Sequence, residues 1–190
     1  MASNPVSKLT EEQYLAFERA AEYKSEFLDG EMLAMSGASR SHVRIQQNLA
    51  GELYARLRGS GCEALGSDIR IRVSSRNYFY ADVSVACDKV ANEGDDNLTN
   101  PVVIFEISSP STARYDRDLK FQRYQDIDSL KDYILVKQER VHIEHFTRQE
   151  DGGWRIRYYP LMGDDVQIDS IGVAIPVSRI YERVNIPPTD

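Results

Sequence analysis

The sequence predicts a single domain of the α/β (α+β) class, in which a mixed central β-sheet is flanked by helices. An apolar run at 102–105 leads into Glu106, and a helical pattern follows near 113–126, as expected of a buried strand connected to a helix. Alternating strand patterns fill much of the remaining chain. The 190 residues contain no internal repeat, low-complexity block or linker, so residues 1–190 are expected to form one domain.

The first segment of the chain predicts a short helix and a hairpin. Thr10 and Gln13 have the spacing of a capping box at the start of an amphipathic helix over 9–21. Asp29-Gly30 is a strong tight-turn pair between two alternating segments, which predicts a β-hairpin over 24–37.

A long helix is predicted over 41–59. Ser39 or Ser41 can cap its start, and Gly59 and Gly61 are expected to end it. Its expected apolar stripe includes Val43, Ala50, Leu53 and Leu57.

Most of the remaining chain is predicted to be strand. Strands are expected at about 62–66, 68–74 and 79–87, with a turn at 75–77, and the acidic loop 88–101 is expected to be solvated. Strand 102–108 should be central in the sheet and should lead into the helix near 113–126. Further strands are predicted at 132–137, 141–148, 154–161 and near 171–177, before a last helical turn over 177–184.

Composition limits the location of the protein and its partners. No apolar run approaches the roughly 20 residues that a membrane-spanning helix needs, and the N-terminal segment lacks the pattern of a signal peptide. Cys62 and Cys87 have neither disulfide-framework density nor metal-site spacing, so we expect reduced core cysteines and a cytoplasmic protein. An exposed sheet edge among the C-terminal strands leaves a homodimer open.

Positive charge is concentrated in one part of an otherwise acidic chain. The net charge of -7 argues against sequence-independent nucleic-acid binding over the whole surface. Between residues 40 and 76, however, seven arginines stand against three acidic residues: Arg40, Arg44, Arg56, Arg58, Arg70, Arg72 and Arg76. These are either solvated faces of helices and strands or a local phosphate-binding patch.

Two predicted strands each carry one carboxylate in apolar surroundings, Asp82 in 79–87 and Glu106 in 102–108. Alternation should place these residues of the first strand on the face opposite Asp82: Phe79, Ala81, Val83 and Val85. Two carboxylates on neighbouring strands would repel each other unless a cation lies between them, which predicts a site for Mg²⁺ or Mn²⁺. Alternatively, either carboxylate caps a loop or pairs with an arginine.

The helix after strand 102–108 can bring a cation to these carboxylates. Asp116, Lys120 and Tyr124 recur at four-residue spacing and therefore share one stripe. Because the helix follows the strand after a short turn, Lys120 can approach the end of that strand. The alternative is a surface ion pair between Asp116 and Lys120.

The combined pattern of YADV, VVIFEISSPST, YDRDLKFQRY and YILV resembles the Uma-two family of restriction-endonuclease-like bacterial proteins, within the PD-(D/E)XK nuclease superfamily. SEFLDGEM, SHVRIQQNLAGEL, SDIRI and VHIEHF extend the resemblance over nearly the whole chain. The resemblance implies a restriction-endonuclease-like core and a metal-dependent nuclease site. Asp82 and Glu106 match the two carboxylates of its signature.

The chain departs from the superfamily signature at two positions. Ala81 replaces the proline before the first carboxylate, which alters only the stiffness of the backbone. Ser108 replaces the signature lysine, and a serine cannot supply its charge. The resembling family takes this lysine from the following helix, where Lys120 is the matching residue.

Four further residues are weighed as site residues. Glu26 and His42 stand at positions that the family pattern favours, and Glu26 is either an additional metal ligand or a surface glutamate at a strand end. His42 either contacts a ligand, carboxylate or phosphate, or caps its helix. His142 and His145 face opposite sides of a strand and are interpreted as structural.

The leading hypothesis is a Mg²⁺-dependent endonuclease acting on DNA, with Asp82 and Glu106 as metal ligands and Lys120 as the catalytic cation. The alternative is a catalytically inactive member of the same fold that binds nucleic acid or protein, which Ser108 and the acidic net charge favour. A two-carboxylate glycosidase is disfavoured because the sequence shows no aromatic sugar platform.

Overall fold

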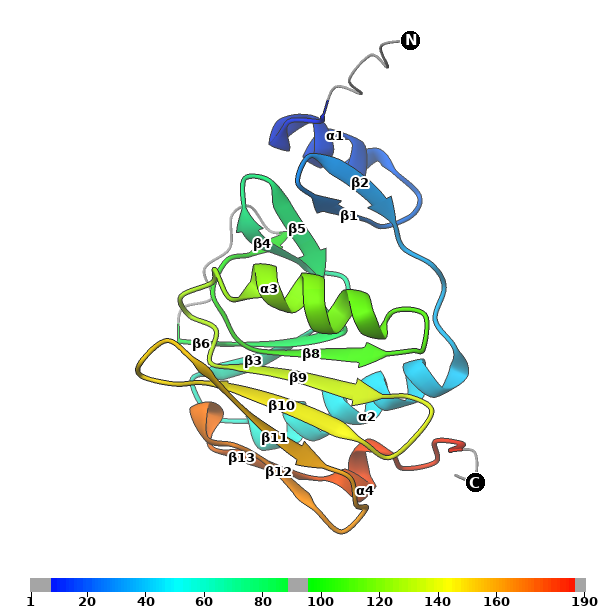
Figure 1. The fold of residues 1–190 in the computed structure, drawn as a ribbon, viewed down its shortest axis with the longest axis vertical. Coiled ribbons are helices and arrows are strands. Elements are labelled where there is room, and N and C mark those ends of the chain that lie inside the picture. The colour runs from blue at the N-terminus through cyan, green and yellow to red at the C-terminus, as the bar shows by residue number, and fades with distance from the viewer. Residues whose placement is uncertain (1–7, 89–95, 187–190) are drawn as a thin grey trace.

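The larger of two main sheets contains six strands in the computed structural model, which describes residues 8–88 and 96–186. Its order is β11-β10-β9-β8-β6-β3 (Figure 1). The strands are β3 (Cys62–Gly66), β6 (Val83–Cys87), β8 (Pro101–Ser108), β9 (Asp132–Lys137), β10 (Ile143–Arg148) and β11 (Trp154–Tyr159). Strand β8 lies in the interior, antiparallel to β6 and parallel to β9. The predicted mixed sheet, with 102–108 as a central strand, is therefore confirmed.

The smaller sheet has the order β2-β1-β5-β4-β7. Its strands are β1 (Ser25–Leu28), β2 (Glu31–Ala34), β4 (Arg70–Ser74), β5 (Asn77–Tyr80) and β7 (Asn97–Leu98). Strands β1 and β2 form the predicted hairpin, and Asp29 and Gly30 have φ angles of 50° and 93°. Positive φ at both residues matches a tight hairpin turn whose twist suits the flanking strands. A separate hairpin joins β12 (Asp165–Ile168) and β13 (Val173–Pro176).

Helices α1 (Glu11–Ala20) and α2 (Arg40–Arg56) begin at capped residues, as predicted. Thr10 and Gln13 form a capping box, and Ser39 Oγ accepts a hydrogen bond of 3.1 Å from the His42 N–H. The buried stripe of α2 consists of Ile45, Leu49, Leu53 and Leu57. The prediction of Val43 in this stripe is wrong, because Val43 is 39% exposed and the stripe runs along the neighbouring row.

The six-stranded sheet is covered on both faces (Figure 1). Helix α2 and the β12–β13 hairpin pack on one face, where Leu49 and Val166 join Val103 and Phe105 in one apolar cluster. The opposite face is covered by the helical segment after β8, which comprises a π-helix at Tyr115–Lys120 (η1) and α3 (Phe121–Tyr124). A 3₁₀ turn at Asp169–Ile171 (η2) and α4 (Val177–Ile180) complete the structure.

The predicted continuous strand 79–87 is wrong. Strand β5 ends at Tyr80 in the smaller sheet, and β6 begins at Val83 in the larger sheet. Because the chain changes sheets at Ala81 and Asp82, the alternation of side chains between the two faces of a strand does not continue from β5 into β6. Phe79 therefore packs in a different apolar cluster from Val83, although they were predicted to share a face.

Part of the predicted solvated loop 88–101 is buried. Asn97 and Leu98 form β7, which pairs in parallel with β4, and Leu98 contributes to the core. A two-residue strand is too short to produce a periodic pattern, so β7 could not be predicted from the sequence. Residues 89–95 of this predicted loop lie outside the described part of the chain.

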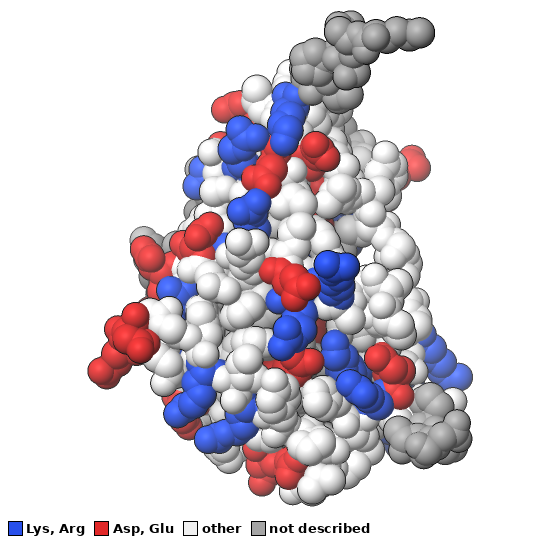
Figure 2. Space-filling model, in the orientation of Figure 1, with Lys and Arg blue, Asp and Glu red and all other residues white. Residues whose placement is uncertain are grey.

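Charged side chains of both signs are interspersed over the face that carries α3 and strands β9–β11 (Figure 2). This face therefore presents no extended surface of one charge. No helix among residues 8–88 and 96–186 has the length and apolar character needed to cross a membrane.

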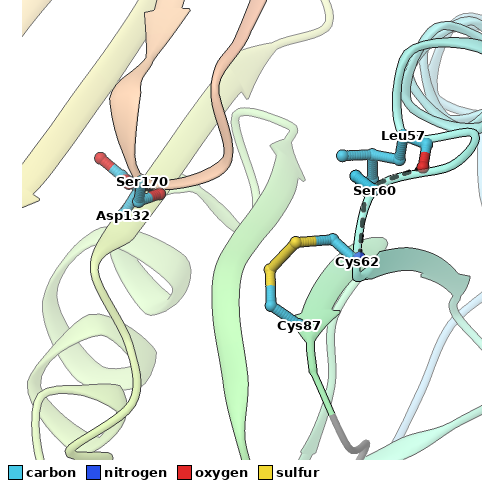
Figure 3. The surroundings of a disulfide bond; sticks show 6 residues. All are labelled: Leu57, Ser60, Cys62, Cys87, Asp132 and Ser170. Carbon is cyan, nitrogen blue, oxygen red and sulfur yellow. Dashed lines mark hydrogen bonds between the residues drawn. A yellow bond between two sulfur atoms is a disulfide. The ribbon is translucent and has the colours of Figure 1, made fainter.

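Cys62 and Cys87 form a disulfide, so the expectation of two reduced cysteines is wrong (Figure 3). The two residues are directly opposite each other in the antiparallel pair β3 and β6. Their separation of 25 residues carries no motif, and only the register of the two strands brings them together. Beside the disulfide, Ser60 Oγ donates to the Leu57 carbonyl at 2.7 Å and accepts from the Cys62 N–H at 3.2 Å.

Candidate active site

A cleft of about 750 Å³ collects residues from both main sheets. Strand β1 and segment 35–39 line one side, and Asp82, the end of β8 and the π-helix line the other. The start of α2 closes one end with His42 and Gln46. Every site residue predicted from the sequence lies in this cleft: Glu26, His42, Asp82, Glu106 and Lys120.

Asp82 is fixed at the point where the chain passes between sheets. The next residue, Val83, pairs with Phe105 on β8, so Asp82 lies beside Glu106. Its Oδ2 accepts a hydrogen bond of 2.7 Å from the Ile107 N–H, and its Oδ1 lies 2.8 Å from His42 Nε2. Burial lowers the pKa of His42, but the hydrogen bond and charge of Asp82 outweigh burial and raise that pKa above its ordinary value.

Glu106 is buried in the floor of the cleft. Its Oε1 accepts hydrogen bonds from Lys120 Nζ at 2.9 Å and from the Tyr124 hydroxyl at 3.3 Å. Burial raises the pKa of Glu106 well above its usual value, and the charge of Lys120 opposes this effect. The neighbouring carboxylates Asp82, Asp116 and Glu26 raise the pKa further.

Lys120 joins the two sheets through one ammonium group. Its Nζ lies 2.7 Å from Glu26 Oε1 on β1 and 2.9 Å from Glu106 Oε1 on β8, and it donates to the Tyr80 carbonyl at 3.1 Å. The residue is only 4% exposed, so the prediction of a lysine beside the signature carboxylate is confirmed in its geometry. Burial lowers the pKa of Lys120, but Glu106, Glu26 and Asp116 raise it well above the ordinary value.

Glu26 is buried, so its interpretation as a surface glutamate is wrong. Besides Lys120, its Oε1 accepts from the Tyr80 N–H at 3.2 Å. Its Oε2 accepts from the Tyr115 hydroxyl at 2.8 Å. Both oxygens of Glu26 are therefore used in holding the lysine and the helix that carries it.

The π-helix explains why Tyr115 and Lys120 face the same cleft. Residues five apart are stacked in this wider helix, which is common at functional sites. Sequence analysis missed Tyr115 because it assumed the four-residue spacing of an α-helix. Asp116 also lines the cleft and is not a surface residue. Burial raises the pKa of Asp116. The charge of Lys120 and a hydrogen bond from Thr112 lower this pKa, whereas the charges of Asp82 and Glu26 raise it.

The remaining predicted residues lie away from this chemistry. Ser108 is buried, and its Oγ has no hydrogen-bond partner among residues 8–88 and 96–186. His145 Nε2 lies 2.6 Å from Asp132 Oδ1, and His142 Nε2 lies 3.8 Å from Glu144. Within the described residues, no three Asp, Glu, His or Cys side chains form a ready-made metal cluster.

The mixed sheet, its flanking helices and this cleft define a protein of the restriction-endonuclease-like class. A solved structure from Anabaena variabilis, described as a "putative nuclease", shares this fold with a TM-score of 0.75 at 14% identity, over 91% of this chain and 97% of that one. The chain belongs to the Uma2 family, described as "Putative restriction endonuclease", whose model matches residues 11–178.

Two relatives from Synechocystis extend over most of the chain. One uncharacterized protein is 37% identical over 180 residues, which cover 94% of each chain. A second uncharacterized protein is 35% identical over 164 residues, or 85% of this chain and 92% of the relative.

Proposed function

We propose that this protein is a divalent-metal-dependent endonuclease that hydrolyses phosphodiester bonds in DNA. The observation that carries the proposal is the buried ammonium of Lys120, 2.9 Å from Glu106, in a cleft where Asp82 lies beside Glu106. Carboxylates with an adjacent lysine can hold a hard cation and stabilise negative charge on a phosphate. Membership of a restriction-endonuclease-like family supports the same reaction class.

The residues of the cleft fit a hard divalent cation. Glu26, Asp82, Glu106 and Asp116 are four carboxylates against the two cationic partners Lys120 and His42. Burial is the main cause of the raised pKa values of Glu106 and Asp116, and the neighbouring carboxylates raise both further. Mg²⁺ commonly binds through one or two carboxylates and keeps several waters, so a ready-made cluster of three ligands is not required.

Asp82 and Glu106 are the proposed ligands, and Glu26 is not. Glu106 lines the cleft, and both of its hydrogen bonds within the described residues are made by Oε1. Its Oε2 is therefore left for a metal ion. His42 and the Ile107 N–H each engage one oxygen of Asp82, which leaves further lone pairs on both. Glu26 instead has both oxygens committed to Lys120, Tyr80 and Tyr115.

A bound Mg²⁺ would polarise the phosphoryl oxygen and lower the pKa of an attacking water. The side chains of the cleft then have separate tasks. Lys120 holds its ammonium toward the scissile phosphate and stabilises the negative charge that develops there. Glu26 and Tyr115 fix the position of Lys120, and His42 orients Asp82.

An inactive binding protein is the second candidate, which Ser108 and the acidic net charge favour. The argument from Ser108 is weakened, because Lys120 supplies an ammonium beside Glu106 without any contribution from residue 108. The two candidates therefore differ in a measurable activity.

Plasmid nicking in Mg²⁺ or Mn²⁺ tests the proposal with wild type, Lys120→Ala and Glu106→Gln. We expect wild type to nick, Glu106→Gln to be inactive, and Lys120→Ala to lose about 10²–10³ in rate, as on loss of one charge-stabilising group. Lys131→Ala, which changes an exposed lysine outside the cleft, serves as the control and should nick like wild type.

Two outcomes would contradict the proposal. A folded wild type that nicks no DNA in either metal would favour the binding protein. Equal rates for Lys120→Ala and wild type, with Glu106→Gln inactive, would keep the metal site but remove Lys120 from catalysis.

A further inference from the structure

The seven arginines between residues 40 and 76 do not form one patch. Four of them have local partners: Arg56 with Glu52, Arg70 with Asp96, Arg72 with Glu11, and Arg76 with the Asp29 carbonyl. The other three are Arg40 and Arg44 in α2 and Arg58 just beyond its end. None of these three forms an ion pair with a residue in the described ranges 8–88 and 96–186.

Helix α2 has three distinct faces. One face packs in the core, and a second lines the cleft with His42 and Gln46. The third face is solvent-exposed, and its residues recur every three or four positions along the chain. Arg44 lies beside this face and is half-buried. Its members are Arg40, Val43, Gln47, Gly51, Tyr54 and Arg58.

This outward face of α2 is basic and carries an exposed aromatic ring. Tyr54 is 65% exposed, and the Arg58 guanidinium lies 5.4 Å from the centre of its ring. The one acidic residue of α2, Glu52, is turned to Arg56 at 3.0 Å and Arg179 at 3.2 Å. Within the described part of the chain, the positive charge of this face thus has no ion-pair partner, on a protein whose net charge is -7.

We propose that the outward face of α2 binds the sugar–phosphate backbone of the nucleic acid whose cleavage the cleft performs; this inference rests on the proposed function. Arginine suits phosphate because its planar fork donates two parallel hydrogen bonds. An exposed tyrosine beside it provides a surface on which a base or sugar can pack.

The position of α2 connects this face to the cleft. Its first two turns carry His42 and Gln46 into the cleft, and Arg40 and Arg44 lie in the same two turns. Residues 40–58 span about 27 Å at about 1.5 Å per residue. That length matches roughly eight phosphates of one strand, which repeat about every 3.4 Å along duplex DNA.

Fluorescence anisotropy with labelled 20-nucleotide DNA, duplex and single-stranded, tests the inference in EDTA, where binding is measured without metal-dependent cleavage. The test variant is Arg40→Ala/Arg44→Ala/Arg58→Ala in the full chain. The matched control is Arg140→Ala/Arg155→Ala/Arg157→Ala, which removes three exposed arginines elsewhere. A salt titration counts phosphate contacts, since each contact contributes about 0.9 to the slope of log affinity against log salt.

We expect the α2 variant to bind at least tenfold more weakly than wild type and to lose about two to three units of salt slope, with the control unchanged. Equal affinity and slope for the α2 variant and the control would overturn the inference, as would a wild type that binds neither DNA at low salt. Binding that depends on α2 in a protein that never nicks would uphold the inference and reject the proposed nuclease.

Discussion

Replacing Lys120 with methionine removes the positive charge that holds the two sheets together while keeping most of the side-chain volume. The ammonium lies 2.7 Å from Glu26 and 2.9 Å from Glu106, and all three side chains are less than 10% exposed. Removal of one partner from a buried ion pair typically costs about 3–5 kcal/mol, because the remaining charge is left without compensation. We expect a loss of about that size in the free energy of unfolding at pH 8.

The loss should shrink in acid. Lys120 opposes the burial that raises the pKa of Glu106, so its removal raises that pKa further. A carboxyl whose pKa is higher in the folded than in the unfolded state contributes to the stability of the fold while it is protonated. This contribution is complete below the unfolded pKa and is lost as the pH rises through the folded pKa. The variant should therefore come closest to wild type in acid, where Glu106 is protonated in both proteins. It should fall behind by up to about 1.4 kcal/mol per pH unit once the pH exceeds the raised pKa of Glu106 in wild type.

Urea unfolding followed by far-ultraviolet circular dichroism at pH 5 and pH 8 measures both effects. The double variant Lys120→Met/Glu106→Gln should recover part of the loss at pH 8, since it removes one of the uncompensated carboxylates. Lys131→Met, at an exposed site, should stay within about 0.5 kcal/mol of wild type. A loss for Lys120→Met below about 1 kcal/mol at both pH values would refute the role of Lys120 as the counter-ion.

Three further predictions concern the carboxylates and the disulfide. Asp82→Asn/Glu106→Gln should abolish Mn²⁺ binding in titration calorimetry, because it removes both proposed ligands. Asp116→Asn should raise the melting temperature at pH 8 but not at pH 3.5: the raised pKa of Asp116 means that its ionised form disfavours folding, so the penalty is absent once the carboxyl is protonated. Cys62→Ser/Cys87→Ser should lower the free energy of unfolding by about 3 kcal/mol in a urea titration, as expected for a bridge that closes a loop of this length.

Each of these has a clear contrary result. Unchanged Mn²⁺ affinity in a folded double variant would place the ligands elsewhere. A melting temperature for Asp116→Asn that is no higher than wild type at pH 8 would mean that Lys120 fully compensates Asp116. Free thiols detected in unreduced wild type, with no change in stability on Cys→Ser substitution, would rule out the disulfide.

The central part of the cleft could be predicted because local sequence determines it. An apolar strand that ends on Glu106 and leads into a helix with Lys120 leaves few ways for the two to approach. Asp82 was indicated by its place as the one carboxylate of an apolar strand, and it also matches the family signature. The pattern also indicated the capped starts of both helices and the Asp29-Gly30 turn, which depend on side chains a few residues apart.

The errors arose where structure depends on contacts distant in sequence. Nothing in residues 79–87 marks the change of sheets at Asp82, because both halves carry strand-forming residues. The burial of Glu26 depends on Lys120, 94 positions later, and the disulfide depends on the register of β3 with β6. The π-helix was missed because the four-residue spacing of Asp116, Lys120 and Tyr124 is that of an ordinary α-helix.

The Glu26–Lys120–Glu106 bridge has an evolutionary consequence. A descendant without selection for the proposed nuclease activity could not simply lose Lys120, because two buried carboxylates would then lack their shared cation and the protein would unfold more easily. Selection for a folded chain alone would retain these three residues long after selection for activity had ended. A relative that retains Glu26, Lys120 and Glu106 therefore retains the ion pairs that stabilise the fold, and these three residues alone do not identify an active enzyme.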